Sequence, residues 1–266
     1  MTRKCLFGQP FFNLVFDDMN SSELILSKKF CITTAEVDIQ QNLRTGALVN
    51  VLIQSAIESA DKLGFGFDNI SSHNLLWVLN KLSLKIYSKV FWKDELTVYT
   101  WPKCVDGLQY IRDFEVMNQK GEKVAAATSS WLAIDNTTRR PKIINDETTE
   151  VFSRLKDKHA IQQKPEKLLP SCEGEEKVIT PEYTDFDLNG HVTATRYIDF
   201  MTNCFELLYL SNNRIDSLDI NYLKEILPNE KLLILKSSDN AKEYIFEGLN
   251  SEIKKSFFRG KIRFKK

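Results

Sequence analysis

The stretch Asp187-Leu188-Asn189-Gly190-His191-Val192, followed by Tyr197, is the part of this sequence that best indicates both fold and chemistry. It joins a strand-like segment, Lys177 to Thr184, to a segment of helical spacing from about Val192 to Leu210. A carboxylate, an amide and an imidazole fall within five residues, although the chain has only 3 histidines. Because a helix N-terminus offers free N–H groups to a developing oxyanion, here near Val192, the stretch indicates water-mediated acyl chemistry.

The same order of elements occurs earlier in the chain. A strand is expected from about Phe30 to Asp38, and a helix from about Thr45 to Leu63, where apolar and small residues share one face. Gly64-Phe65-Gly66 is expected to stop this helix. Strand-like segments follow each helix, at 75–88, 95–103, 108–118 and 123–135, and again at 216–227, 231–237, 243–249 and 255–264. The pattern predicts an α+β fold in which each half wraps an antiparallel sheet around a long helix.

The region between the two halves is charged, lacks periodicity and contains Pro165 and Pro170. We therefore expect one domain over 1–145, a linker over 146–176 with a helix near 148–158, and a second domain over 177–266. An ungapped shift of 147 residues places Asp187 on Gln40 and His191 on Arg44. On that alignment only the second half keeps the charged set, so one active centre is expected.

Composition excludes several classes of function. Lys plus Arg equals Asp plus Glu, 36 each, which gives no electrostatic reason to expect a nucleic acid. The 5 cysteines are widely spaced without C-x-x-C, so neither a disulfide framework nor a zinc site is expected. The apolar patch at 10–16 lacks the features of a signal peptide. No run reaches the ~18 apolar residues that span a bilayer, so we expect a cytoplasmic protein without a membrane segment.

The chain resembles the acyl-acyl-carrier-protein thioesterases of plants and bacteria. The family motif D-x-N-x-H-V with a following Tyr is matched by Asp187, Asn189, His191, Val192 and Tyr197. A second family segment, roughly L-D-Y-R-R-E-C, is similar to 220–226, with Glu225 at the position of the catalytic Glu. Further markers in family order are Gly64-Phe65-Gly66, Leu76-Trp77-Val78, Trp92-Lys93-Asp94, Thr100-Trp101, Arg112-Asp113, Ser129-Ser130-Trp131 and the stretch 135–141 with Arg139-Arg140.

This resemblance implies a tandem hotdog fold and hydrolysis of fatty acyl thioesters on acyl carrier protein, without metal or cofactor. The catalytic residues it implies are Asp187, Asn189, His191 and Glu225. Either Glu225 or Asp187 could be the base that activates water. Ile226 stands where the family often has Cys, so a covalent cysteine mechanism is not expected there. The acyl carrier protein is the expected partner, and a homodimer is possible.

Other interpretations of these residues remain open. His191 could cap the helix, Asp187 could form a local turn, and Glu225 could face solvent from a strand. Cys204 is expected in the core. A hotdog thioesterase acting on acyl-coenzyme A would share the chemistry and differ only in the carrier. A non-enzymatic acyl-binding protein is the third alternative, but such a protein would not need both carboxylates.

Overall fold

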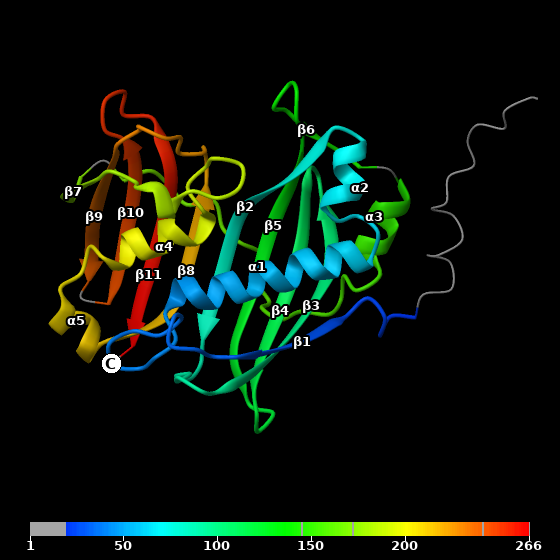
Figure 1. Ribbon diagram of the computed structural model, residues 1–266, viewed down its shortest axis with the longest axis horizontal. Helices are drawn as coiled ribbons and strands as arrows, with labels where there is room; N and C mark the ends of the chain where they lie inside the picture. Colours follow the sequence, from blue (N-terminus) through cyan, green and yellow to red (C-terminus); the bar gives the residue numbers. More distant parts are fainter. Residues whose placement is uncertain (1–19, 145, 172, 241, 266) are drawn as a thin grey trace, which may run out of the picture.

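The computed structural model describes residues 20–144, 146–171, 173–240 and 242–265 (Figure 1). Within them, one 11-stranded sheet has its strands in the order β1-β3-β4-β5-β2-β8-β11-β10-β9-β7, with β6 paired to β5. The apolar patch at 10–16 lies outside the described residues. None of the helices described has the length and apolar character needed to cross a bilayer.

The two halves repeat one arrangement. The first half contains β1 (Leu26–Cys31), α1 (Thr45–Lys62), α2 (Phe67–Ser72), β2 (Leu75–Ile86), β3 (Glu95–Asp106), β4 (Gln109–Asn118), β5 (Lys123–Asp135) and β6 (Pro141–Lys142), and the linker contains α3 (Asp146–Ser153). The second half contains β7 (Glu175–Ile179), a 3-10 turn (Tyr183–Asp185), α4 (Ala194–Thr202), α5 (Leu207–Asn212), β8 (Arg214–Tyr222), β9 (Leu232–Asn240), β10 (Glu243–Asn250) and β11 (Ser256–Lys265). In Figure 1, α1 and α4 cross the same face of the sheet. The tandem hotdog predicted from the sequence is confirmed.

Helix α1 is buried along one face and ends where the sequence indicates. Leu48, Leu52 and Ala56 are each no more than 5% exposed and belong to the main core. Gly64 follows the helix with φ of 74°, a left-handed conformation that favours glycine. The predicted stop at Gly64 is therefore confirmed.

The second helix is shorter than the sequence predicts. We expected one helix from about Val192 to Leu210, but α4 ends at Thr202 and α5 begins at Leu207. In the gap, Phe205 packs edge-on against Tyr244 and Phe264, with ring centroids 4.7 and 5.0 Å away. Lys236 Nζ donates to the Cys204 carbonyl at 2.9 Å, which satisfies a carbonyl freed by the break. Aromatic packing onto the sheet thus replaces about one turn of helix between α4 and α5.

The halves meet along β2 and β8. Ser83 and Asp219 lie opposite each other at the centre of this antiparallel pair, and the Ser83 hydroxyl donates to the Asp219 carboxylate at 2.5 Å. Helices α1 and α4 also touch each other, and Gly46 allows it: a Cβ there would lie 2.5 Å from Asp199 Oδ1. The single sheet and the helix contact make one packed body of both halves.

The structural repeat has a different register from the one proposed from the sequence. Thr45 and Ala194, the first residues of α1 and α4, are 149 positions apart. The preceding loops share this offset, because the Asp38 N–H donates to the Asn42 carbonyl as the Asp187 N–H does to the His191 carbonyl, at 2.8 Å in both. The shift of 147 was wrong. Asp187 corresponds to Asp38 and not to Gln40.

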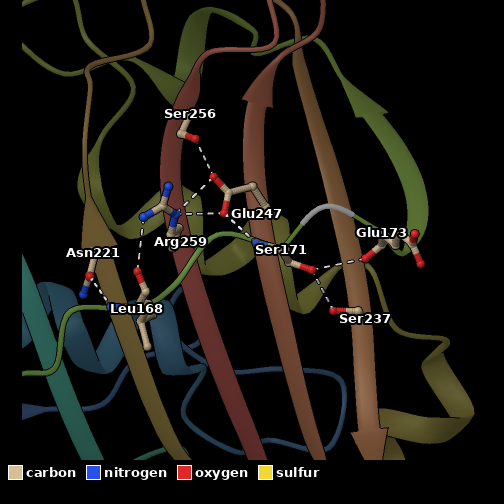
Figure 2. Close-up of polar contacts among 8 residues, drawn as sticks. All are labelled: Leu168, Ser171, Glu173, Asn221, Ser237, Glu247, Ser256 and Arg259. Atoms are coloured by element: carbon tan, nitrogen blue, oxygen red, sulfur yellow. Dashed lines mark hydrogen bonds and ion pairs between the residues drawn. The ribbon is translucent and has the colours of Figure 1, made fainter.

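The linker crosses the face of the sheet opposite α1 and α4. Asp113, which is fully buried, accepts the Ala160 N–H at 2.8 Å, and Asn221 accepts the Leu168 N–H at 2.8 Å. Figure 2 shows its last contacts, where Glu247 binds Arg259 at 2.9 Å and accepts the Ser171 N–H at 3.2 Å. Buried polar side chains of the sheet therefore hold the linker in place. The domain limits expected at 145 and 176 stay a prediction.

We predict that the Glu247–Arg259 pair is important for stability. Glu247 is 2% and Arg259 17% exposed in this ion pair, and removing one partner leaves a buried charge without a counter-charge. Glu247→Ala should lower the free energy of unfolding by about 3 kcal/mol, the lower end of the range for such losses. Glu58→Ala, which removes two surface ion pairs, with Lys28 and Lys62, should cost about 1 kcal/mol or less. Equal losses in the free energy of unfolding for the two variants, measured by urea denaturation, would contradict this assignment.

Candidate active site

The loop that precedes α4 closes on itself through backbone bonds. Phe186 and Val192 form an antiparallel bridge, and the Asp187 N–H donates to the His191 carbonyl at 2.8 Å. The Gly190 N–H donates back to the Asp187 carbonyl at 3.0 Å. Gly190 has φ of 74°, a value that glycine adopts without steric cost. This tight turn explains why a glycine separates Asn189 from His191.

The Asp187 carboxylate shapes this loop. Its Oδ1 accepts the backbone N–H groups of Asn189 at 2.8 Å and His191 at 3.3 Å. That is the local turn expected as an alternative for Asp187. The exposed Asn189 side chain has no hydrogen-bond partner among the described residues, so its amide is free to bind a ligand.

Glu225 does not lie in a strand, contrary to the sequence prediction. Strand β8 ends at Tyr222, and both the Leu223 and Lys224 N–H groups donate to the carbonyl of Phe257, at 2.8 and 3.0 Å. This shared acceptor ends the regular pairing, so the chain turns away before Glu225. The expected strand 216–227 is therefore five residues too long at its C-terminal end.

Two backbone bonds of Ile226 place Glu225 beside the loop. The Ile226 carbonyl accepts the Val192 N–H at 3.0 Å, and its N–H donates to the Tyr197 hydroxyl at 3.3 Å. Tyr197 is itself buried and packs edge-on against the Tyr222 ring, 5.4 Å away. Burial raises the pKa of Tyr197 well above its ordinary value, so the hydroxyl stays neutral. A rigid aromatic pair thus fixes the backbone next to Glu225.

The structure brings Glu225 and His191 together. Glu225 Oε2 lies 3.4 Å from His191 Nε2, and the Glu225 side chain is 35% exposed in this pair. Among the described residues, Asp187 is hydrogen-bonded to His191 only through the His191 backbone, and the Asn189 side chain makes no hydrogen bond to Asp187, His191 or Glu225. The carboxylate of Glu225 is therefore both held and open to water.

Arg139 is a further residue of this site that was not assigned there from the sequence. Its guanidinium forms an ion pair with Glu225 Oε1. It stands at the end of a turn after β5, where Asp135 accepts the Thr138 N–H at 2.7 Å and Arg139 has φ of 56°. The hydrogen bonds from Lys142 and Thr138 hold the pKa of Asp135 well below its usual range. The Asp135 carboxylate within the turn therefore stays negatively charged. The sequence places Arg139 only among the family markers, because nothing local indicates a partner 86 positions away.

The expected oxyanion donors are partly wrong. The Val192 N–H is bound to the Ile226 carbonyl, and the Thr193 N–H donates to the Asp185 carbonyl at 2.9 Å. Neither can serve a ligand in this arrangement. The N–H groups of Ala194 and Thr195, in the first turn of α4, have no partner among the described residues.

Two further observations concern metal-ligating groups and Cys204. The described residues contain no group of three or more His, Cys, Asp or Glu side chains placed to hold a metal ion. Cys204 packs against the core, its thiol donates to the Phe200 carbonyl at 3.3 Å, and burial raises its pKa. The arrangement is suited to deprotonating a water molecule, with a partly exposed carboxylate between an imidazole and a guanidinium.

Comparisons with known proteins identify the family of this chain. The acyl-ACP thioesterase N-terminal domain matches residues 23–152, and the acyl-ACP thioesterase C-terminal domain matches residues 170–265. A chloroplastic palmitoyl-acyl carrier protein thioesterase of Gossypium hirsutum is 28% identical over 76% of this chain and 52% of its own length. The chain thus spans about half the length of that curated relative.

Solved structures give the same result. An acyl-ACP thioesterase from Bacteroides thetaiotaomicron has a TM-score of 0.86 and 25% identity, over 93% of this chain and 100% of its own. The 12:0-ACP thioesterase from Umbellularia californica shares the fold, with a TM-score of 0.79 and 21% identity, over 91% and 97%. With both family domains matched in order across most of its length, the chain belongs to the acyl-ACP thioesterase family.

Proposed function

We propose that the protein hydrolyses the thioester of a fatty acyl group on acyl carrier protein, releasing the fatty acid and the carrier with its free thiol. The observation that carries this proposal is the Glu225 carboxylate, held against His191 and Arg139 yet partly open to solvent. Membership of the acyl-ACP thioesterase family supplies the substrate class. A thioester carbonyl is electrophilic enough for activated water to attack it directly.

Glu225 is the better of the two candidates for the base. One oxygen of Asp187 is engaged by two backbone N–H groups, which suits a residue that holds the loop. Glu225 takes a proton from water as the water oxygen attacks the thioester carbon. The tetrahedral intermediate then collapses, the C–S bond breaks, and the proton passes from Glu225 to the departing sulfur.

The remaining groups bind and orient the reactants. The free Asn189 amide can donate to the thioester oxygen, and the open N–H groups of Ala194 and Thr195 are further candidates for the oxyanion. A donor of this kind is typically worth about 3 kcal/mol in the transition state. His191 fixes the Glu225 carboxylate and orients the water.

The halves divide the work in this proposal. The second half, 177–266, carries Asp187, Asn189, His191 and Glu225, while the first half, 1–145, receives the acyl tail. Arg139 modifies that division, since the first half supplies one group that touches Glu225. The cytoplasmic location and the homodimer expected from the sequence stay predictions.

Acyl-coenzyme A is the alternative carrier. The carboxylate, imidazole and amide would act on either thioester in the same way, so the chemistry of the site does not separate them. Turnover of one acyl group on both carriers distinguishes the two functions. A higher kcat/KM for the acyl-coenzyme A thioester would replace the proposed substrate.

We predict that Glu225→Gln, which keeps the shape and removes the base, lowers kcat by roughly 10²–10⁴-fold, the range typical of general-base loss. Glu252→Gln, at an exposed glutamate outside the site, should leave kcat unchanged. Steady-state hydrolysis of a palmitoyl-carrier thioester measures both. A Glu225→Gln protein with normal turnover, or a stable acyl-cysteine seen by mass spectrometry, would contradict the mechanism.

We also predict that Arg139→Met lowers kcat by roughly tenfold to a hundredfold, because a base that loses one of its two contacts is less well positioned. Arg140→Met is the matched control, since the exposed Arg140 side chain has no partner among the described residues. A purely structural role would lower thermal stability without this loss in kcat. A rise in KM without a change in kcat would assign Arg139 to carrier binding instead.

A further inference from the structure

A cavity of about 1000 Å³ lies at the other end of β8 from Glu225. In Figure 1, the loop before α1, helix α5 and the end of β11 gather at this edge of the molecule. The nine residues of β8 separate it from Glu225, roughly 30 Å at about 3.3 Å a residue. None of Asp187, Asn189, His191 or Glu225 lines it. Its volume is at the upper end of the range usual for ligand pockets, about 300–1,000 Å³.

This cavity is built from the first-half copy of the catalytic loop. The Asp38 carboxylate accepts the N–H groups of Gln40 and Asn42, at 2.8 and 2.9 Å, as Asp187 does for Asn189 and His191. With the offset of 149, Gln40 stands for Asn189 and Asn42 stands for His191. All three residues of this copied loop line the cavity.

Lys89 occupies the place of Glu225 in this copy. The Leu43 N–H donates to the Val90 carbonyl at 2.8 Å, the counterpart of the bond from Val192 to Ile226. Lys89 precedes Val90 as Glu225 precedes Ile226, and it also lines the cavity. An ammonium group has no acceptor, so it cannot take a proton from water. The copy therefore has the shape of the catalytic site without its base.

The charges of the cavity favour an anion. Arg44 and Arg196 pair with Asp199, and the loop holds Asp38. That leaves Lys89 and Lys265, both exposed and without an ion pair among the described residues. Arg214 adds a third cation, whose only described partner is the Tyr87 carbonyl at 3.1 Å.

Part of the wall between these cations is apolar, although polar side chains such as Asn42, Ser88 and Thr202 also line it. The apolar residues include Leu48, Ile86, Val90, Val124, Leu210 and Ile215. Aliphatic walls beneath a cationic rim fit a molecule with an anionic head and a hydrocarbon tail.

We propose that this cavity binds the carboxylate of a free fatty acid without hydrolysing anything, with Lys89 as the partner of the carboxylate and the apolar walls around the chain. The inference rests on the copied loop and on the charges of the cavity. Since fatty acid binding needs no turnover, the proposal stands or falls independently of the proposed function.

Photolabelling of the full chain tests the proposal. The probe is a hexadecanoate that carries a diazirine near its methyl end, and labelled peptides are mapped by mass spectrometry. We expect label on peptides that contain Ile86 or Leu210, competed by unlabelled hexadecanoate. Lys89→Glu should reduce that label by about tenfold or more, a factor that corresponds to about 1.4 kcal/mol.

Two controls make the test specific. Lys85→Glu makes the same charge change on an exposed residue of β2 that does not line the cavity, and it should leave the label unchanged. The matching hexadecanol probe, which lacks the charge, should label the same peptides about tenfold less. Label found only near 187–193 and 225, or label that persists at full level in Lys89→Glu, would overturn the proposal. Circular dichroism confirms that each variant is folded.

Discussion

The hydrogen bond from the Val192 N–H to the Ile226 carbonyl, 3.0 Å long, is the contact on which the candidate site depends. It joins the loop before α4 to the irregular segment after β8, two parts of the chain that no strand pairing would bring together. The Tyr197 hydroxyl accepts the N–H of the same residue, so both backbone groups of Ile226 are fixed. The backbone of Ile226, directly after Glu225, is therefore fixed by hydrogen bonds. This positions the Glu225 carboxylate in addition to the contacts that the carboxylate makes itself. That is the kind of support a catalytic group requires, because small displacements reduce rates sharply.

The first half contains the same bond, from Leu43 to Val90, with different side chains around it. The backbone geometry of the two loops is thus a property of the fold, and the chemistry depends on which side chains it presents. Glu225 is replaced by Lys89 and His191 by Asn42, so one end of the β2–β8 pair presents a carboxylate beside an imidazole and the other end presents an ammonium group beside an amide. The central pair of Ser83 and Asp219 lies between them.

Local features of this chain were predictable and contacts between distant residues were not. The end of α1 at Gly64 and the start of β5 at Lys123, two residues after Gly121 with φ of 77°, follow from glycine conformation, which is local. The break after Thr202 depends on Phe205 packing against Tyr244 and Phe264, which periodicity does not reveal. The loop motif at 187–192 could be located because its members are close in sequence, whereas its contact with Glu225 could not. The repeat register failed because a few chance identities outweighed a hydrogen-bond pattern that the sequence does not display.

Arg139 shows that both halves contribute side chains to the candidate site. Its turn belongs to β5 and is held by the Asp135 carboxylate, yet its guanidinium reaches Glu225 across the joint between the halves. Because β2 and β8 are paired directly, any change in that pairing would move Arg139 relative to Glu225. The position of the carboxylate therefore depends on the continuous sheet as well as on its own loop. Both halves of the fold thus determine the geometry around Glu225 in the candidate site.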